Sequence, residues 1–121
     1  MTDLVERIAQ AIARFEGFYK LGSVAQRQNN PGNLRSWGKT PVVGGYASFP
    51  TPEDGWKALR RQVQKNIDRG LTLQEFFAGK PGVYAGYSPA SDDNHPVPYA
   101  TFVAQRVGIS VDAVLAQLQG T

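Results

Sequence analysis

Glu16 is the residue whose type and position are best suited to chemistry in this 121-residue chain. On a helical wheel it shares a face with Ile12, whereas Arg7, Gln10 and Arg14 fall on the opposite side. An acid on the buried face of an amphipathic helix is a candidate proton donor. The apolar residues that define this helix have helical spacing and are Leu4, Val5, Ile8, Ala11, Ile12 and Phe15.

The expected surroundings of Glu16 favour its protonated form. The helix should stop at Gly17, so the carboxyl lies in the last turn, where the helix dipole disfavours negative charge. Phe15, Phe18 and Tyr19 are expected to surround the carboxyl with apolar material. Both effects raise its pKa and keep a proton available near neutral pH, as a general acid requires. The alternative is that Glu16 lies at a frayed helix end and points into solvent.

The absence of certain residue types excludes other kinds of catalytic site. The sequence has no cysteine and a single histidine, His95, so it offers no thiol nucleophile, disulfide or thiolate zinc site. It also lacks the Gly-x-Ser-x-Gly and phosphate-loop motifs. We therefore expect no metal and no cofactor, and chemistry carried by carboxylates with amides and tyrosines in support.

Composition indicates one globular domain over residues 1–121 and a monomer. The apolar fraction is 41%, the charged fraction is 19%, and no apolar run approaches the roughly 18 residues of a membrane span. The net charge of +3 suits an anionic partner, but Lys and Arg are too sparse for a nucleic-acid binder. Asp3 and Glu6 interrupt the N-terminal apolar stretch, which excludes a secretory signal peptide.

The elements that must position Glu16 are predicted to be mainly helical. The longest of these helices carries a cation at every fourth position of its outer face, at Lys57, Arg61 and Lys65. These cations either form a solvated face or attract the protein to the anionic cell envelope. The predicted elements are a helix opening at Thr2, a small β-hairpin within residues 34–50, a helix from Thr51 to about Arg69, a short helix after a capping box at Thr72, an irregular segment over 78–98, a helix over 99–107, and a last helix over 111–119 capped by Ser110.

Several motifs, in order along the chain, resemble those of the lysozyme-like superfamily. The segment Phe15-Glu16-Gly17-Phe18-Tyr19 resembles the catalytic Glu-Gly segment of phage-type lysozymes. The run Gln28-Asn29-Asn30-Pro31-Gly32-Asn33-Leu34-Arg35 resembles the Asn-Asn-Pro-Gly-Asn motif of the group, and residues 46–56 are similar to its hairpin-to-helix junction. Tyr87-Ser88-Pro89, Asp93-Asn94 and Tyr99-Ala100 resemble a later signature that lytic transglycosylases share.

The resemblance implies a mainly α, α+β lysozyme-like fold that acts on the β-1,4 MurNAc-GlcNAc bond of peptidoglycan, with Glu16 as the catalytic acid. Hydrolysis of such a bond commonly requires two carboxylates. Phage lysozymes place an aspartate in the β-element, whereas this chain has no acid between Glu16 and Glu53. The candidates for a second carboxylate are Glu53, Asp54, Asp92 and Asp93, of which the first two have a structural role at a helix start.

A lytic transglycosylase needs one acid, which also deprotonates the sugar's 6-hydroxyl and leaves a 1,6-anhydro end. The residue types suited to hold the sugar are Asn30, Asn33, Tyr46, Asn94 and Tyr99. Asn30 and Asn33 could instead only form a turn, Asn94 could cap a helix, and Tyr99 could be core. The aromatic residues of the irregular segments could stack on sugar rings or pack as lids, and these are Trp37, Tyr46, Tyr84 and Tyr87.

The leading hypothesis is therefore an enzyme that cleaves glycan strands of peptidoglycan, a lytic transglycosylase or lysozyme. It would be made in the cytoplasm and act at the bacterial cell wall or in the periplasm, and its source could be a phage. The alternative from another class is a catalytically silent module of a phage or secretion machine that grips glycan without cutting it. A small nucleic-acid binder ranks last.

Overall fold

The computed structural model describes residues 3–90 and 94–119 and is mainly helical with a two-stranded antiparallel sheet, which confirms the predicted class at this level. Its elements in chain order are α1 (Leu4–Phe15), α2 (Val24–Arg27), β1 (Val42–Val43), β2 (Tyr46–Ala47), α3 (Pro52–Asp68), α4 (Leu73–Ala78), α5 (Pro96–Val107) and α6 (Leu115–Leu118). Within the described part of the chain, no helix is both long and apolar enough to cross a membrane.

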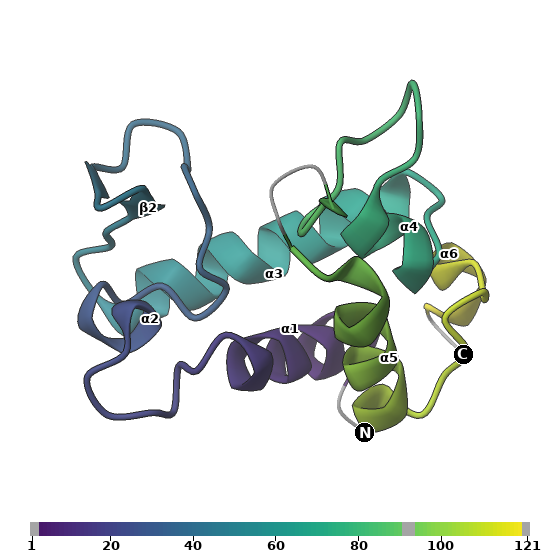
Figure 1. Ribbon diagram of the computed structural model, residues 1–121, viewed down its shortest axis with the longest axis horizontal. Coiled ribbons are helices and arrows are strands. Elements are labelled where there is room, and N and C mark those ends of the chain that lie inside the picture. The colour runs from purple at the N-terminus through teal and green to yellow at the C-terminus, as the bar shows by residue number, and fades with distance from the viewer. Residues whose placement is uncertain (1–2, 91–93, 120–121) are drawn as a thin grey trace.

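Helix α3 runs through the middle of the molecule and the other elements gather at its two ends (Figure 1). Helices α4, α5 and α6 lie at its C-terminal end, and α1 packs against both α3 and α5. Helix α2 and the β-hairpin lie at its N-terminal end. The main core joins α1, α3, α4 and α5, and its largest fully buried side chains include Ile8, Ile12, Leu59, Phe76 and Phe77.

Local signals explain where the helices begin. Thr51 caps α3 by accepting a hydrogen bond from the Asp54 N–H, and Pro52 occupies the first turn. Thr72 and Glu75 form the predicted capping box of α4. The cap of α1 is Asp3, whose carboxylate accepts from the Glu6 N–H at 2.8 Å, while Thr2 lies outside the described residues.

One helix was missed, and the bounds of two others were predicted wrongly. The four-residue helix α2 has no apolar periodicity of its own and was missed. Helix α5 begins at Pro96 rather than residue 99, because proline is accommodated in a first turn. The last helix is only Leu115–Leu118, since the Ser110 hydroxyl accepts from the Asp112 N–H and forms a turn instead of a helix cap.

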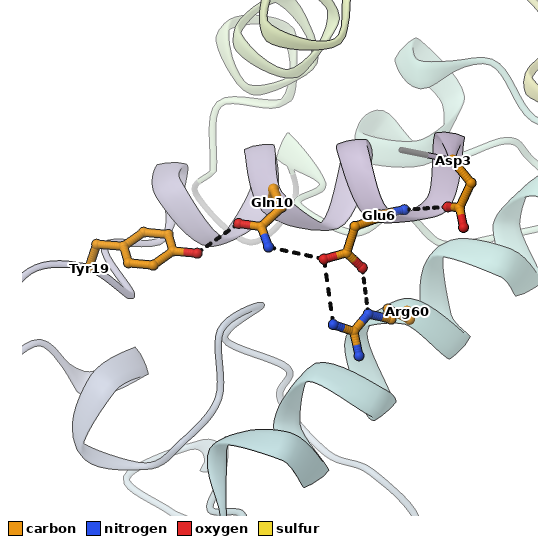
Figure 2. A network of polar contacts seen from close by, with 5 residues as sticks. All are labelled: Asp3, Glu6, Gln10, Tyr19 and Arg60. Atoms are coloured by element: carbon orange, nitrogen blue, oxygen red, sulfur yellow. Dashed lines mark hydrogen bonds and ion pairs between the residues drawn. The ribbon is translucent and has the colours of Figure 1, made fainter. Parts of the chain in front are cut away.

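A chain of polar contacts fixes α1 against α3 on the exposed side of the interface (Figure 2). Arg60 of α3 donates to Glu6 at 2.6 Å, Gln10 donates to the same carboxylate at 3.0 Å, and Tyr19 donates to Gln10 at 2.7 Å. The contacts with Arg60 lower the pKa of Glu6. Tyr19 thus connects the loop after α1 to the middle of that helix.

The turn over residues 29–33 lies directly against the start of α3. Gly55 provides the room, because a Cβ atom there would stand 1.9 Å from the Asn29 carbonyl oxygen and 2.8 Å from Cδ of Pro31. The Phe49 N–H donates to the Gln28 carbonyl at 2.9 Å and so ties the end of the hairpin to the same turn. These contacts join the hairpin, the turn and α3 into one unit beside α1.

Candidate active site

Glu16 lies directly after the last residue of α1, and two side chains from distant segments hold its carboxyl. Its N–H donates to the Ile12 carbonyl at 2.9 Å, so its backbone continues the helix. The Tyr99 hydroxyl of α5 donates to Oε2 at 2.6 Å, and Nδ2 of Asn33 donates to Oε1 at 3.1 Å. The carboxyl is therefore fixed at a junction of α1, α5 and the 29–33 turn, rather than extended from a frayed end.

The two asparagines of the turn have different positions. Asn30 is fully buried, where Nδ2 donates to the carbonyls of Leu34 and Ala47 at 3.0 and 2.9 Å. Its Oδ1 accepts from the Leu34 N–H at 2.9 Å, so all of these bonds hold backbone in place. Asn33 has a left-handed backbone (φ 49°), which asparagine tolerates, and its side chain reaches Glu16. Asn33 lines the pocket beside Glu16, and Asn30 does not.

Tyr99 is buried in a stack of three aromatic rings. Its ring centroid lies 3.8 Å from that of Phe15 and 4.2 Å from that of Phe77, each with an interplanar angle of 21°. Rings at this separation prevent the tyrosine from swinging aside, and its hydroxyl emerges from the stack at the Glu16 carboxylate. Tyr99 is thus a core residue whose hydroxyl holds the Glu16 carboxyl, and it does not itself line the pocket in which a sugar would bind.

Burial raises the pKa of Glu16 above its ordinary value of 4.5. The hydrogen bonds from Tyr99 and Asn33 and the positive charge of Arg35 act in the opposite direction, but burial is the larger effect. Burial also raises the pKa values of Tyr87 and Tyr99 well above 10, with the nearby Glu16 charge as the next cause. Tyr99 therefore remains a neutral hydrogen-bond donor over the pH range in which Glu16 titrates.

The residues that shield Glu16 differ from those expected. Tyr19 is 53% exposed, and its hydroxyl is directed toward Gln10 (Figure 2). Phe18 packs edge-on against Trp56 of α3. Two further rings lie at the site: Tyr99 touches the carboxyl, and Tyr87 lines the same pocket and donates to the Gly32 carbonyl at 2.5 Å.

Glu16 opens onto a pocket of about 230 Å³ between the hairpin side and a wall formed by residues 84–88 together with Asn94. This volume is below the roughly 300–1,000 Å³ of most small-molecule sites, so a polymeric ligand would extend beyond it. Trp37 is the one predicted stacking residue that is not in the lining. The lining residues are Glu16, Asn33, Leu34, Arg35, Ser36, Tyr46, Gln62, Tyr84, Gly86, Tyr87, Ser88 and Asn94.

Arg35 is one of the pocket residues that the sequence did not single out. Its guanidinium lies over the Tyr46 ring, 5.0 Å from the centroid, and its charge acts on Glu16. The sequence did contain a signal for Arg35, because it lies only two residues after Asn33. If Asn33 reaches the site, Arg35 must lie near the same pocket. Gln62 of α3 gave no signal, since its helix pattern shows only that it is polar.

Glu16 is the only carboxylate among the described residues that line this pocket. Asp54 lies at the start of α3, where its carboxylate accepts from the Thr51 hydroxyl at 3.0 Å, and Glu53 is exposed in the same turn. Asp92 and Asp93 lie outside the described residues. Within the described ranges no group of three or more acidic or histidine side chains is placed to hold a metal ion.

The hydrogen bond from Tyr99 gives a pH-dependent prediction. Tyr99→Phe removes a contact that favours the carboxylate, so the pKa of Glu16 should rise further. An activity that needs protonated Glu16 should then persist to higher pH, while its maximum falls about tenfold because the carboxyl is held less firmly. Measuring rate against pH tests this. Tyr84→Phe, in the same pocket, is the control and should leave the alkaline limb in place; an unmoved limb in Tyr99→Phe would contradict the assignment.

Comparison of the chain with protein-family models, with curated proteins and with solved structures found no match.

Proposed function

We propose that this protein is a lysozyme-like enzyme that cleaves the glycan strands of peptidoglycan, with Glu16 as its general acid. The observation that carries the proposal is the Glu16 carboxyl, whose pKa is raised by burial and which is held by Tyr99 and Asn33 at the wall of an open pocket. The ordered motifs that resemble the superfamily supply the substrate class, and its place of action would be the bacterial cell wall.

The proposed reaction needs no second carboxylate. Glu16 donates its proton to the glycosidic oxygen as the bond from that oxygen to the anomeric carbon breaks, and the bonding electrons leave with the oxygen. The resulting carboxylate then takes the proton of the sugar's own 6-hydroxyl, whose oxygen bonds to the anomeric carbon. This restores the acid, consumes no water and leaves a 1,6-anhydro end. Glu16 is the one carboxylate that the described residues contribute to the pocket, which favours this lytic route over hydrolysis.

The residues around Glu16 have complementary roles in this scheme. Tyr99 and Asn33 would stabilise the carboxylate between the two proton transfers, because both donate hydrogen bonds to it. Tyr46 offers a ring face and Arg35 a cation at the pocket wall. Asn94 and Ser88 supply neutral polar groups to hold the sugar.

Product analysis tests both the activity and the route. We expect purified sacculi incubated with the protein to release muropeptides with 1,6-anhydro ends, detected by mass spectrometry. Repeating the digestion in water enriched in heavy oxygen distinguishes the mechanisms, since a lytic reaction incorporates none of the label and hydrolysis incorporates one oxygen per cleavage. Labelled reducing ends would replace the transglycosylase with a lysozyme. Binding to sacculi without release would indicate the silent glycan-gripping module instead.

A further inference from the structure

A second hollow lies beside the catalytic pocket, along the outer face of α3. We name it the α3 groove; its volume is about 550 Å³, and it is lined by Trp37, Thr40, Phe49, Pro50, Asp54, Lys57, Ala58 and Arg61. One wall is therefore the α3 helix, and the other is the segment before β1 together with the end of the hairpin. Its apolar lining residues are Trp37, Phe49, Pro50 and Ala58, while the charged groups come from α3.

The cations of the α3 groove have no counter-ion in the described part of the chain. Lys57 and Arg61 are exposed, and the two ion pairs found there are Arg60 with Glu6 and Lys80 with Glu75. Lys65, one turn further along, lies over the Trp37 ring at 5.2 Å from its centroid. The one carboxylate in the lining, Asp54, accepts a hydrogen bond from Thr51 and forms no ion pair with either cation among the described residues. The groove thus combines an indole face with a row of cations and an excess of positive charge.

The α3 groove and the catalytic pocket share a wall. Leu34, Arg35 and Ser36 line the pocket, and the next residue, Trp37, lines the groove. On α3, Gln62 lines the pocket and the adjacent Arg61 lines the groove. A branched ligand with one arm in the pocket could therefore place a second arm in the groove without crossing the body of the protein.

We propose that the α3 groove binds the acidic stem peptide carried by the glycan strand, an inference that rests on the proposed function. Stem peptides combine carboxylates with short aliphatic side chains. The carboxylates would form ion pairs with Lys57 and Arg61, and the aliphatic groups would pack on the ring of Trp37. The enzyme would then distinguish peptide-bearing from bare glycan through a surface that does not touch the bond being cleaved.

The test compares two substrates and two matched double variants. Lys57→Gln/Arg61→Gln should raise KM about three- to tenfold on peptide-bearing glycan, which corresponds to losing two partly exposed ion pairs. Its kcat should stay unchanged, as should both constants on glycan stripped of peptide by an amidase. Lys20→Gln/Arg106→Gln removes two exposed charges elsewhere and should leave KM on both substrates at the wild-type value.

A binding measurement separates this inference from the proposed function. An N-acetylated stem tetrapeptide containing alanine and glutamate should shift the indole N–H resonance of Trp37, but not that of Trp56, and Lys57→Gln/Arg61→Gln should remove the shift. If that result appears and the protein cleaves neither glycan, the activity proposal fails and the groove assignment stands. If the protein cleaves glycan but the peptide moves neither resonance, the groove assignment is overturned. Equal KM changes on both substrates, or preferential binding of a polyphosphate, would also overturn it.

Discussion

Glu16→Gln should fold like the wild type and release muropeptides about 10²–10⁴ times more slowly, or not at all. Glutamine keeps the size of the side chain and an oxygen that can accept from Tyr99, but it has no proton to donate to a glycosidic oxygen. The measurement is the initial rate of muropeptide release at equal protein concentration, with retained binding to sacculi as the control for the fold. Turnover near that of the wild type would remove Glu16 from the mechanism.

The same variant has an expected signature in stability. Because burial raises the pKa of Glu16 in the folded state, the folded protein binds more protons than the unfolded chain between pH 4.5 and that raised pKa. The free energy of unfolding contributed by Glu16 therefore falls as pH rises through this window, and glutamine lacks this dependence. The stability of Glu16→Gln relative to the wild type should increase with pH across the window and level off above it. A difference that is constant with pH would show that the carboxyl is not desolvated.

Among Gly→Ala substitutions at the described glycines, we expect Gly55→Ala to lower the free energy of unfolding the most. In an ordinary helix this change is mildly favourable, because alanine has the higher helix propensity. Here the new Cβ would stand 1.9 Å from the Asn29 carbonyl oxygen, so α3 and the 29–33 turn must separate. We expect a loss of about 3 kcal/mol or more of unfolding free energy, at or beyond the upper end of overpacking costs. Because the turn carries Asn33, the remaining folded protein should also lose activity.

Thermal and denaturant unfolding measure this effect directly. Glu53→Ala is the matched control, since it places alanine at an exposed position of the same first turn and should cost at most about 1 kcal/mol, the interaction of that charge with the helix dipole. A stable Gly55→Ala protein with normal activity would mean that the turn does not lie against α3 as described.

Much of the helical framework could be predicted because its signals are local. The amphipathic pattern of α1, the Thr51 cap of α3 and the Thr72 capping box each depend on residues three or four apart. Helix α2 and the true extent of α6 were not predictable in this way. These four-residue helices have too few turns to show a periodicity and are set by contacts such as that of the Leu115 N–H with the Leu71 carbonyl at 3.0 Å.

The candidate site also has a part that local sequence signals predict and a part that depends on tertiary contacts. The helical pattern of α1 was enough to place Glu16 on the buried face, because that inference uses one helix, but it left open whether the carboxyl points into solvent. The local sequence does not tell which of the two turn residues, Asn30 or Asn33, reaches the carboxyl. Their side-chain orientations depend on how the hairpin packs against the turn. The nearby rings were also misassigned, because Tyr87 and Tyr99 reach Glu16 only through tertiary packing, whereas Phe18 and Tyr19 are close in sequence alone.

The contact between Tyr99 and Glu16 also bears on when the candidate site is complete during synthesis of the chain. Glu16 leaves the ribosome before its hydroxyl partner, which comes 83 residues later, on α5. A nascent chain that ends before Pro96 contains the acid without the ring stack that holds it, and α1 still exposes the face that α5 covers. Translation therefore delivers Glu16 before the side chain that holds it, so the assembled site exists only once α5 has emerged and docked.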